Sequence, residues 1–124
     1  MFSASGKWLL ILGAVYLVCF FGLTDAGLIG PDEPRYASIA REMARSGDWV
    51  TPVLWGHPWF EKPPLLYWMV GAAVRLGLGE DLAPRLPVAL MSAVFLFVYF
   101  QLLRAEFGVR PAAYATGILG TSAL

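Results

Sequence analysis

The residues able to do chemistry are concentrated in two short segments, Asp32–Ala37 (DEPRYA) and Phe60–Trp68 (FEKPPLLYW). The first segment contains Asp32, a carboxylate that can accept a proton when it is ionised, and a helix N-terminus favours the ionised form. Arg35 and Lys62 supply cations that can stabilise a developing negative charge. Acid–base chemistry beside a cation would use these residue types, but their spacing alone does not separate that role from a helix start at Asp32 or an interface lysine at Lys62.

Other kinds of site have weaker support. His57 and Glu61 are close in sequence and could both ligate a metal ion, but two such residues do not make a metal site. Further ligands would have to come from loops outside this sequence, so we assign no metal and no cofactor. The sequence shows no nucleophile elbow, phosphate-binding loop, haem motif or internal repeat.

Composition narrows the class of protein. Of the 124 residues 58% are hydrophobic and 15% are charged, the mean hydropathy is +0.63, and nine basic residues balance nine acidic ones. The apolar content excludes disorder, the balanced charge excludes a nucleic-acid binder, and the single cysteine, Cys19, excludes a disulfide scaffold. A very apolar small domain or part of a membrane protein remains.

Two apolar runs, residues 8–24 and residues 86–103, predict transmembrane helices. A hydrocarbon core of about 30 Å needs roughly 20 helical residues, a length that both runs approach. A third run, residues 111–124, has too few residues to cross the bilayer and is interpreted as the start of another span. We therefore expect a fragment of a longer polytopic membrane protein.

The basic residues at the ends of these runs set the expected orientation. Lys7, Arg104 and Arg110 lie at one set of ends and favour the cytoplasmic side, which places the loop of residues 25–85 in the periplasm. The first run also has the basic flank and the length of a secretory signal peptide. Residues 24–27 make a poor cleavage site, so we favour an uncleaved helix.

The loop predicts two helices. Pro34 suits a first helical position and Gly47 a helix end, which predicts a helix over about 34–46. Its expected apolar face consists of Tyr36, Ile39, Ala40, Met43 and Ala44. A second helix over about 64–79 is too short to span and is interpreted as juxtamembrane or re-entrant. The aromatic and proline-rich stretch between them predicts an irregular belt at the membrane interface.

The two motifs, in this order and between two spans, resemble the first extracytoplasmic loop of the polytopic GT-C glycosyltransferases. The similarity is greatest to the aminoarabinose transferases that modify lipid A, with the protein O-mannosyltransferases as more distant relatives. It extends over most of the chain and implies an all-α polytopic protein of the bacterial inner membrane. The two loop helices would then be juxtamembrane amphipathic helices.

The resemblance also implies an activity. Members of that family transfer a sugar with inversion from a polyprenyl-phosphate donor to a hydroxyl acceptor at the periplasmic face, and the acceptor is lipid A, a protein or a glycan. The catalytic base of the family corresponds to Asp32, and the lysine that binds the lipid phosphate corresponds to Lys62. Arg35, Glu33 and Tyr36 are further candidates for substrate binding. We expect the 124-residue chain to be inactive alone.

Each role has a structural alternative. Asp32 and Glu33 could serve only the helix start, and Lys62 could be an interface lysine that extends to water. Arg35 could pair with Asp48 or Glu42. The aromatic residues are better explained as packing or interface anchors than as platforms for a sugar. A non-catalytic transporter or scaffold fragment is the alternative for the whole chain.

Overall fold

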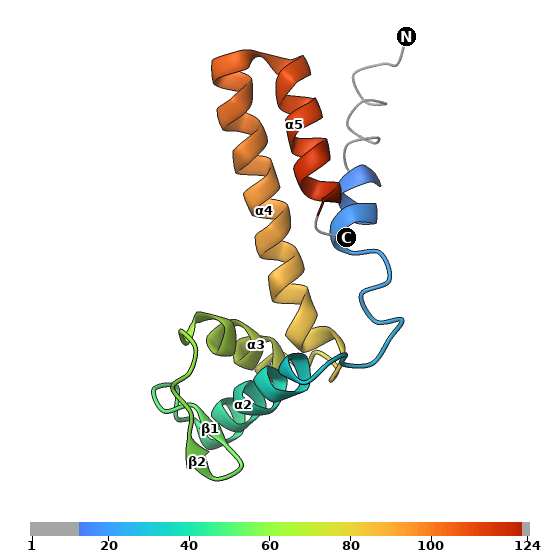
Figure 1. Cartoon of the computed structure of the whole chain (residues 1–124). Helices are drawn as coiled ribbons and strands as arrows, with labels where there is room; N and C mark the ends of the chain where they lie inside the picture. Colours follow the sequence, from blue (N-terminus) through green and yellow to red (C-terminus); the bar gives the residue numbers. More distant parts are fainter. Residues whose placement is uncertain (1–12, 123–124) are drawn as a thin grey trace. The chain divides into compact units, whose positions relative to one another are not determined.

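The computed structural model describes residues 13–122, which are mostly helical (Figure 1). The elements run in the order α2 (Asp32–Ser46), β1 (Val53–Leu54), β2 (His57–Pro58), α3 (Leu65–Arg75), α4 (Leu82–Phe107) and α5 (Val109–Thr121). Residues 13–19 are also helical. The described residues form two compact units. One comprises residues 22–88, and the other comprises residues 13–21 and 89–122.

α2 forms where the sequence analysis placed a helix, but it begins at Asp32 and not near Pro34. Pro31 takes the N-cap position with φ −79° and ψ −25°, so the chain is already helical one residue before the acidic pair. Gly47 ends the helix with φ +78°, and its N–H donates to the carbonyl of Met43 at 3.0 Å. The buried face consists of Ala37, Ile39, Ala40, Met43 and Ala44.

α3 packs against α2 within the first unit. The approach is close at Gly71, where an added Cβ would lie 2.9 Å from a ring carbon of Trp49 and 3.2 Å from the carbonyl oxygen of Ala40. The expected end of this helix at residue 79 is wrong. α3 ends at Arg75, because Gly77 adopts φ +82° and turns the chain away from the helix axis.

β1 and β2 form a small antiparallel hairpin in the stretch that the sequence analysis expected to be irregular. Leu54 pairs with His57, and the two turn residues between them, Trp55 and Gly56, both have positive φ, at 51° and 81°. A two-residue hairpin turn with both φ positive matches the twist of the strands that it joins. The sequence analysis expected only helices, so this hairpin is an element that it did not predict.

A shared apolar cluster joins the hairpin to the two helices. Ile39 and Met43 from α2, Leu54 from β1 and Tyr67 from α3 are at most 2% exposed. Burial of four large side chains supplies the main favourable free energy of such a unit. The two loop helices are therefore packed against each other through their apolar faces.

The second unit contains most of α4, together with α5 and residues 13–21. Within the described part of the chain, α4 is the one helix long and apolar enough to cross a membrane. Its 26 residues extend about 39 Å at 1.5 Å per residue. The helix is longer than the apolar run of residues 86–103, and it includes Arg85 and Arg104, which flank that run.

The other two apolar runs lie only partly within the described residues. α5 has 13 residues, from Val109 to Thr121. The first predicted span, residues 8–24, lies partly outside the described residues. Its described part is helical only to residue 19, and Gly22 then adopts φ +70°.

Replacement of Gly71 by alanine tests the packing of α2 on α3. The new methyl group would meet Trp49 and the α2 backbone, and overpacking of this kind costs about 1–3 kcal/mol, more than the roughly 1 kcal/mol that alanine gains in helix propensity. We expect a lower unfolding midpoint, measured by thermal denaturation in detergent. Gly79→Ala is the control because its Cβ would enter open space. Equal midpoints for the two variants would contradict the packing.

Candidate functional site

The first turn of α2 exposes the carboxylate of Asp32. Its side chain is 64% exposed. Its one hydrogen-bond partner among the described residues is Arg35, whose Nη1 donates to Oδ1 at 3.2 Å. The N-cap residue, Pro31, makes no side-chain hydrogen bond that would close the start of the helix. An exposed ion pair of this type contributes little stability, so Asp32 remains accessible to a ligand.

The pairing of Arg35 differs from the structural alternative that placed it against Asp48 or Glu42. Asp48 instead accepts backbone N–H groups from Val50 at 2.9 Å and Thr51 at 3.0 Å. These bonds stabilise the ionised carboxylate and hold the pKa of Asp48 below its ordinary value. Asp48 therefore organises the turn after α2, and Arg35 is directed to the helix start.

Packing brings the two sequence motifs together. The guanidinium carbon of Arg35 lies 5.8 Å from the centre of the Trp59 ring. The rings of Tyr36 and Tyr67 lie 6.0 Å apart with a tilt of 56°. Thus the start of α2 contacts residues on both sides of Lys62 in the sequence, although the motifs are about 25 residues apart.

Lys62 lies on the exposed segment between these two contacts. Its ammonium group makes no hydrogen bond or ion pair with residues 13–122, and the structure does not join it directly to Asp32. Glu61, its neighbour, is also exposed and is close enough to Tyr67 to influence that hydroxyl. Lys62 thus lies on an exposed segment whose flanking residues, Trp59 and Tyr67, contact the first turns of α2.

Two polar atoms of the residues that flank this segment are buried. The hydroxyl of Tyr67 and the indole Nε1 of Trp59 are inaccessible and have no hydrogen-bond partner among the described residues. Burial, with smaller contributions from Tyr36 and Glu61, raises the pKa of Tyr67. Tyr67 is thus a buried residue of the apolar cluster, and Tyr36 is half-buried against the same cluster.

Metal ligation receives no support from the described part of the chain, where no three His, Cys, Asp or Glu side chains gather in one place. His57 lies in β2 and is exposed, and Glu61 lies in the following segment. Neither has a third ligand beside it within residues 13–122.

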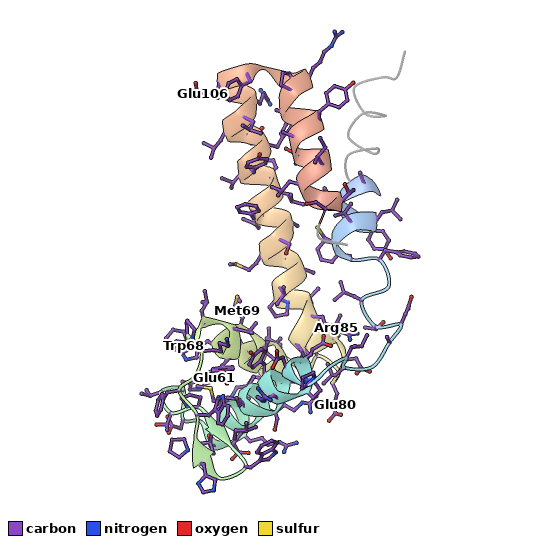
Figure 2. The ribbon with its side chains drawn as sticks, in the orientation of Figure 1. Glu61, Trp68, Met69, Glu80, Arg85 and Glu106 are labelled. Carbon is purple, nitrogen blue, oxygen red and sulfur yellow. The ribbon has the colours of Figure 1, made fainter. Side chains whose placement is uncertain are left out.

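Glu33, one residue after Asp32, has a different environment. Its Oε1 accepts from Nε of Arg85 at 2.6 Å, and its Oε2 accepts from Nη2 of Arg85 at 3.1 Å and from the N–H of Ile29 at 2.7 Å. Figure 2 shows Arg85 near the start of α4, beside the first turn of α2. The hydrogen bonds from Arg85, ahead of the smaller contribution of Ile29, hold the pKa of Glu33 below its ordinary value.

This pair separates the roles of the two adjacent acids. Glu33 is engaged by Arg85 and by the backbone, whereas Asp32 is exposed. Arg85 was not a candidate from the sequence, where it marks the boundary of an apolar run. Its partners are 52 to 62 residues away, and no local pattern indicates them.

The pH dependence of stability tests the Glu33–Arg85 pair. A folded-state pKa below the unfolded value gives stability that is present above the ordinary carboxyl pKa, about 4.3, and is lost as pH falls through the folded value. We expect wild type to exceed Glu33→Gln in thermal midpoint at pH 7 and the gap to narrow below about pH 4.3. The control, Glu42→Gln, removes an exposed carboxylate from the same helix. A gap for Glu33→Gln that does not change with pH would contradict the pairing.

Comparison with known proteins reveals extended similarity, although no protein-family model matches the chain. It is 36% identical over 120 residues to undecaprenyl phosphate-alpha-4-amino-4-deoxy-L-arabinose arabinosyl transferase 2 of Pseudomonas fluorescens, covering 94% of this chain and 20% of the relative. It is 40% identical over 95 residues to the corresponding transferase of Edwardsiella ictaluri, covering 76% of this chain and 17% of the relative.

Solved structures show the same similarity. The crystal structure of ArnT from Cupriavidus metallidurans in the apo state matches 92% of this chain and 21% of that chain, with 43% identity and a TM-score of 0.78. The structure of ArnT from the same organism bound to undecaprenyl phosphate matches 95% of this chain and 24% of that chain, with 37% identity and a TM-score of 0.80. The chain thus spans about a fifth of these relatives, and the resemblance predicted from its two motifs is confirmed.

Proposed function

We propose that this chain supplies the base and the phosphate-binding cation of a membrane glycosyltransferase whose sugar donor is linked to undecaprenyl phosphate. The observation that carries the proposal is the packing of DEPRYA against the segment that contains FEKPPLLYW. Tyr36 contacts Tyr67 inside that motif, and Arg35 contacts Trp59, the residue just before it. The similarity to aminoarabinose transferases over more than nine tenths of the chain supports the same activity.

Lys62 is assigned to the phosphate of the donor. Cleavage of the anomeric C–O bond leaves a phosphate monoester, so a second negative charge develops on the leaving oxygen in the transition state. A cation beside that oxygen stabilises the transition state more than the ground state, as catalysis requires. The exposed ammonium group of Lys62 is free for this interaction within the described structure, and Arg35, in the first turn of α2, is a second candidate cation.

Asp32 is assigned as the base that receives the proton of the acceptor hydroxyl. The hydroxyl becomes acidic only as its oxygen bonds to the oxocarbenium-like carbon, so a carboxylate of ordinary strength suffices. Attack from the side opposite the leaving phosphate gives inversion. Glu33 and Tyr36, which contact Arg85 and Tyr67, are assigned to support of the site.

The setting follows the same resemblance. We place the reaction at the periplasmic face of the bacterial inner membrane, with residues 25–85 in the first periplasmic loop of a GT-C fold. The acceptor class is lipid A, and a protein or another glycan are the alternatives with the same chemistry. The apolar α4 is consistent with a multi-pass protein.

Asp32→Asn tests the proposed base. The experiment uses a full-length protein that contains this segment, or the Pseudomonas fluorescens relative with its matching fifth replaced by this chain. We expect kcat for transfer from an undecaprenyl-phosphate sugar to fall about 10²- to 10⁴-fold, because a positioned base contributes this much. Glu42→Gln, an exposed isosteric change on the same helix, is expected to leave kcat unchanged. Full activity in Asp32→Asn would remove the assignment.

Lys62→Ala tests the proposed phosphate site. Loss of one group that stabilises a developing oxyanion costs about 10²–10³-fold in rate, and we expect a loss of that size together with weaker binding of undecaprenyl phosphate. The control, Arg45→Ala, removes an exposed cation at the opposite end of α2. Unchanged binding of undecaprenyl phosphate and unchanged transfer in Lys62→Ala would contradict the proposal.

A further inference from the structure

Arg85 uses every N–H of its guanidinium group. Nε donates one hydrogen bond to Glu33, and Nη2 donates another, as described above. Nη2 donates its second hydrogen bond to the carbonyl of Gly27 at 2.8 Å. Nη1 donates to the carbonyls of Leu23 at 2.7 Å and Ala26 at 2.5 Å. A guanidinium has five N–H donors in a fixed plane, so all five are occupied.

This saturation determines what Arg85 can do. Its charge is paired with Glu33 and its donors are directed into the protein, so it has no donor left for a substrate phosphate. A lysine could not replace it, because an ammonium has three donors and no planar fork. Arg85 is therefore suited to fixing the position of other groups.

The groups that Arg85 holds lead directly to Asp32. The carbonyls belong to the segment that enters α2, and Glu33 is the second residue of the helix. Glu33 also accepts the N–H of Ile29, which closes the turn before the helix. Since Pro31 provides no side-chain cap, the start of α2 depends on these contacts of Glu33 and Arg85.

We infer that Arg85 is a positioning residue for the transfer reaction, which fixes Asp32 by locking the entry segment and the first turn of α2 through Glu33. This inference rests on the proposed function. Among residues 13–122, Asp32 itself pairs only with Arg35, and this exposed ion pair is too weak to fix its geometry. A misplacement of about 1 Å in a reacting group can lower a rate about 10²-fold.

The test is Arg85→Gln in the full-length protein, with kcat expressed per molecule that binds undecaprenyl phosphate. This normalisation removes any effect of a smaller folded fraction. We expect kcat to fall about 10- to 100-fold with the KM for the donor and the binding of undecaprenyl phosphate unchanged, because the phosphate contacts are assigned elsewhere. Arg85→Lys should not restore kcat.

Arg75→Gln is the matched control. Arg75 also ties a neighbouring helix to α2, because its Nε donates to the carbonyl of Ala44 at 3.1 Å and its guanidinium lies 5.4 Å from the Trp49 ring. These contacts are at the C-terminal end of α2. We expect Arg75→Gln to lower stability and to leave normalised kcat unchanged.

Glu33→Gln is the second variant, for use if Arg85→Gln does not fold, since it leaves the three carbonyl contacts of Arg85 in place. We expect Glu33→Gln to lower normalised kcat as well, by a smaller factor than Arg85→Gln does. Normalised kcat at the wild-type level in the folded variant, or a raised donor KM with normal kcat, would overturn the inference. If wild type itself shows no transfer, the proposed function fails; if wild type transfers and the Arg85 variant matches it, only the inference fails.

Discussion

The position of the first turn of α2 is the constraint on which the rest of the site depends, and Arg85 holds that end of the helix while Arg75 stabilises the other end. At the first turn, Arg85 from the start of α4 pairs with Glu33. At the last turn, Arg75 from α3 donates to the carbonyl of Ala44, an acceptor that the helix itself leaves unsatisfied. Between these ends the apolar face of α2 is buried against α3 and the hairpin. A helix fixed in this way can present Asp32 from an exposed first turn without losing its geometry.

The neighbouring acids Asp32 and Glu33 show how environment divides roles between similar groups. Glu33 accepts three hydrogen bonds and is stabilised in its ionised form, which suits a structural anchor. Within residues 13–122 Asp32 accepts one exposed contact, from Arg35, and stays accessible, as the proposed role requires. The sequence alone shows two adjacent carboxylates of similar chemistry. The structure distinguishes them by their partners, Arg35 for Asp32 and Arg85 for Glu33.

Local patterns in the sequence predicted the parts of the fold that local interactions determine. Pro34, Gly47 and the spacing of Ile39 and Met43 placed α2 and its buried face, because helix ends and apolar periodicity are properties of neighbouring residues. The hairpin was missed because its strands have two residues each and its turn contains a tryptophan with positive φ. The end of α3 was placed too late because the apolar pattern continues past Gly77.

For the candidate site, too, the sequence indicated residues within short motifs but not the contacts between distant residues. The motifs indicated Asp32, Arg35 and Lys62 as candidates, but the contacts of Arg35 with Trp59 and of Glu33 with Arg85 arise from the tertiary fold. Arg85 in particular acts over more than fifty residues of sequence, and as the flank of an apolar run it resembled any basic residue at a membrane boundary. Long-range partners of this kind require a structure.

The most direct test of the central claim is an experimental structure of the full-length protein containing this segment, with undecaprenyl phosphate bound. The account predicts the ammonium of Lys62 within about 3 Å of a phosphate oxygen, with the carboxylate of Asp32 facing the same cavity on the periplasmic side. A phosphate bound away from Lys62, with Asp32 facing a different cavity or the cytoplasm, would contradict it.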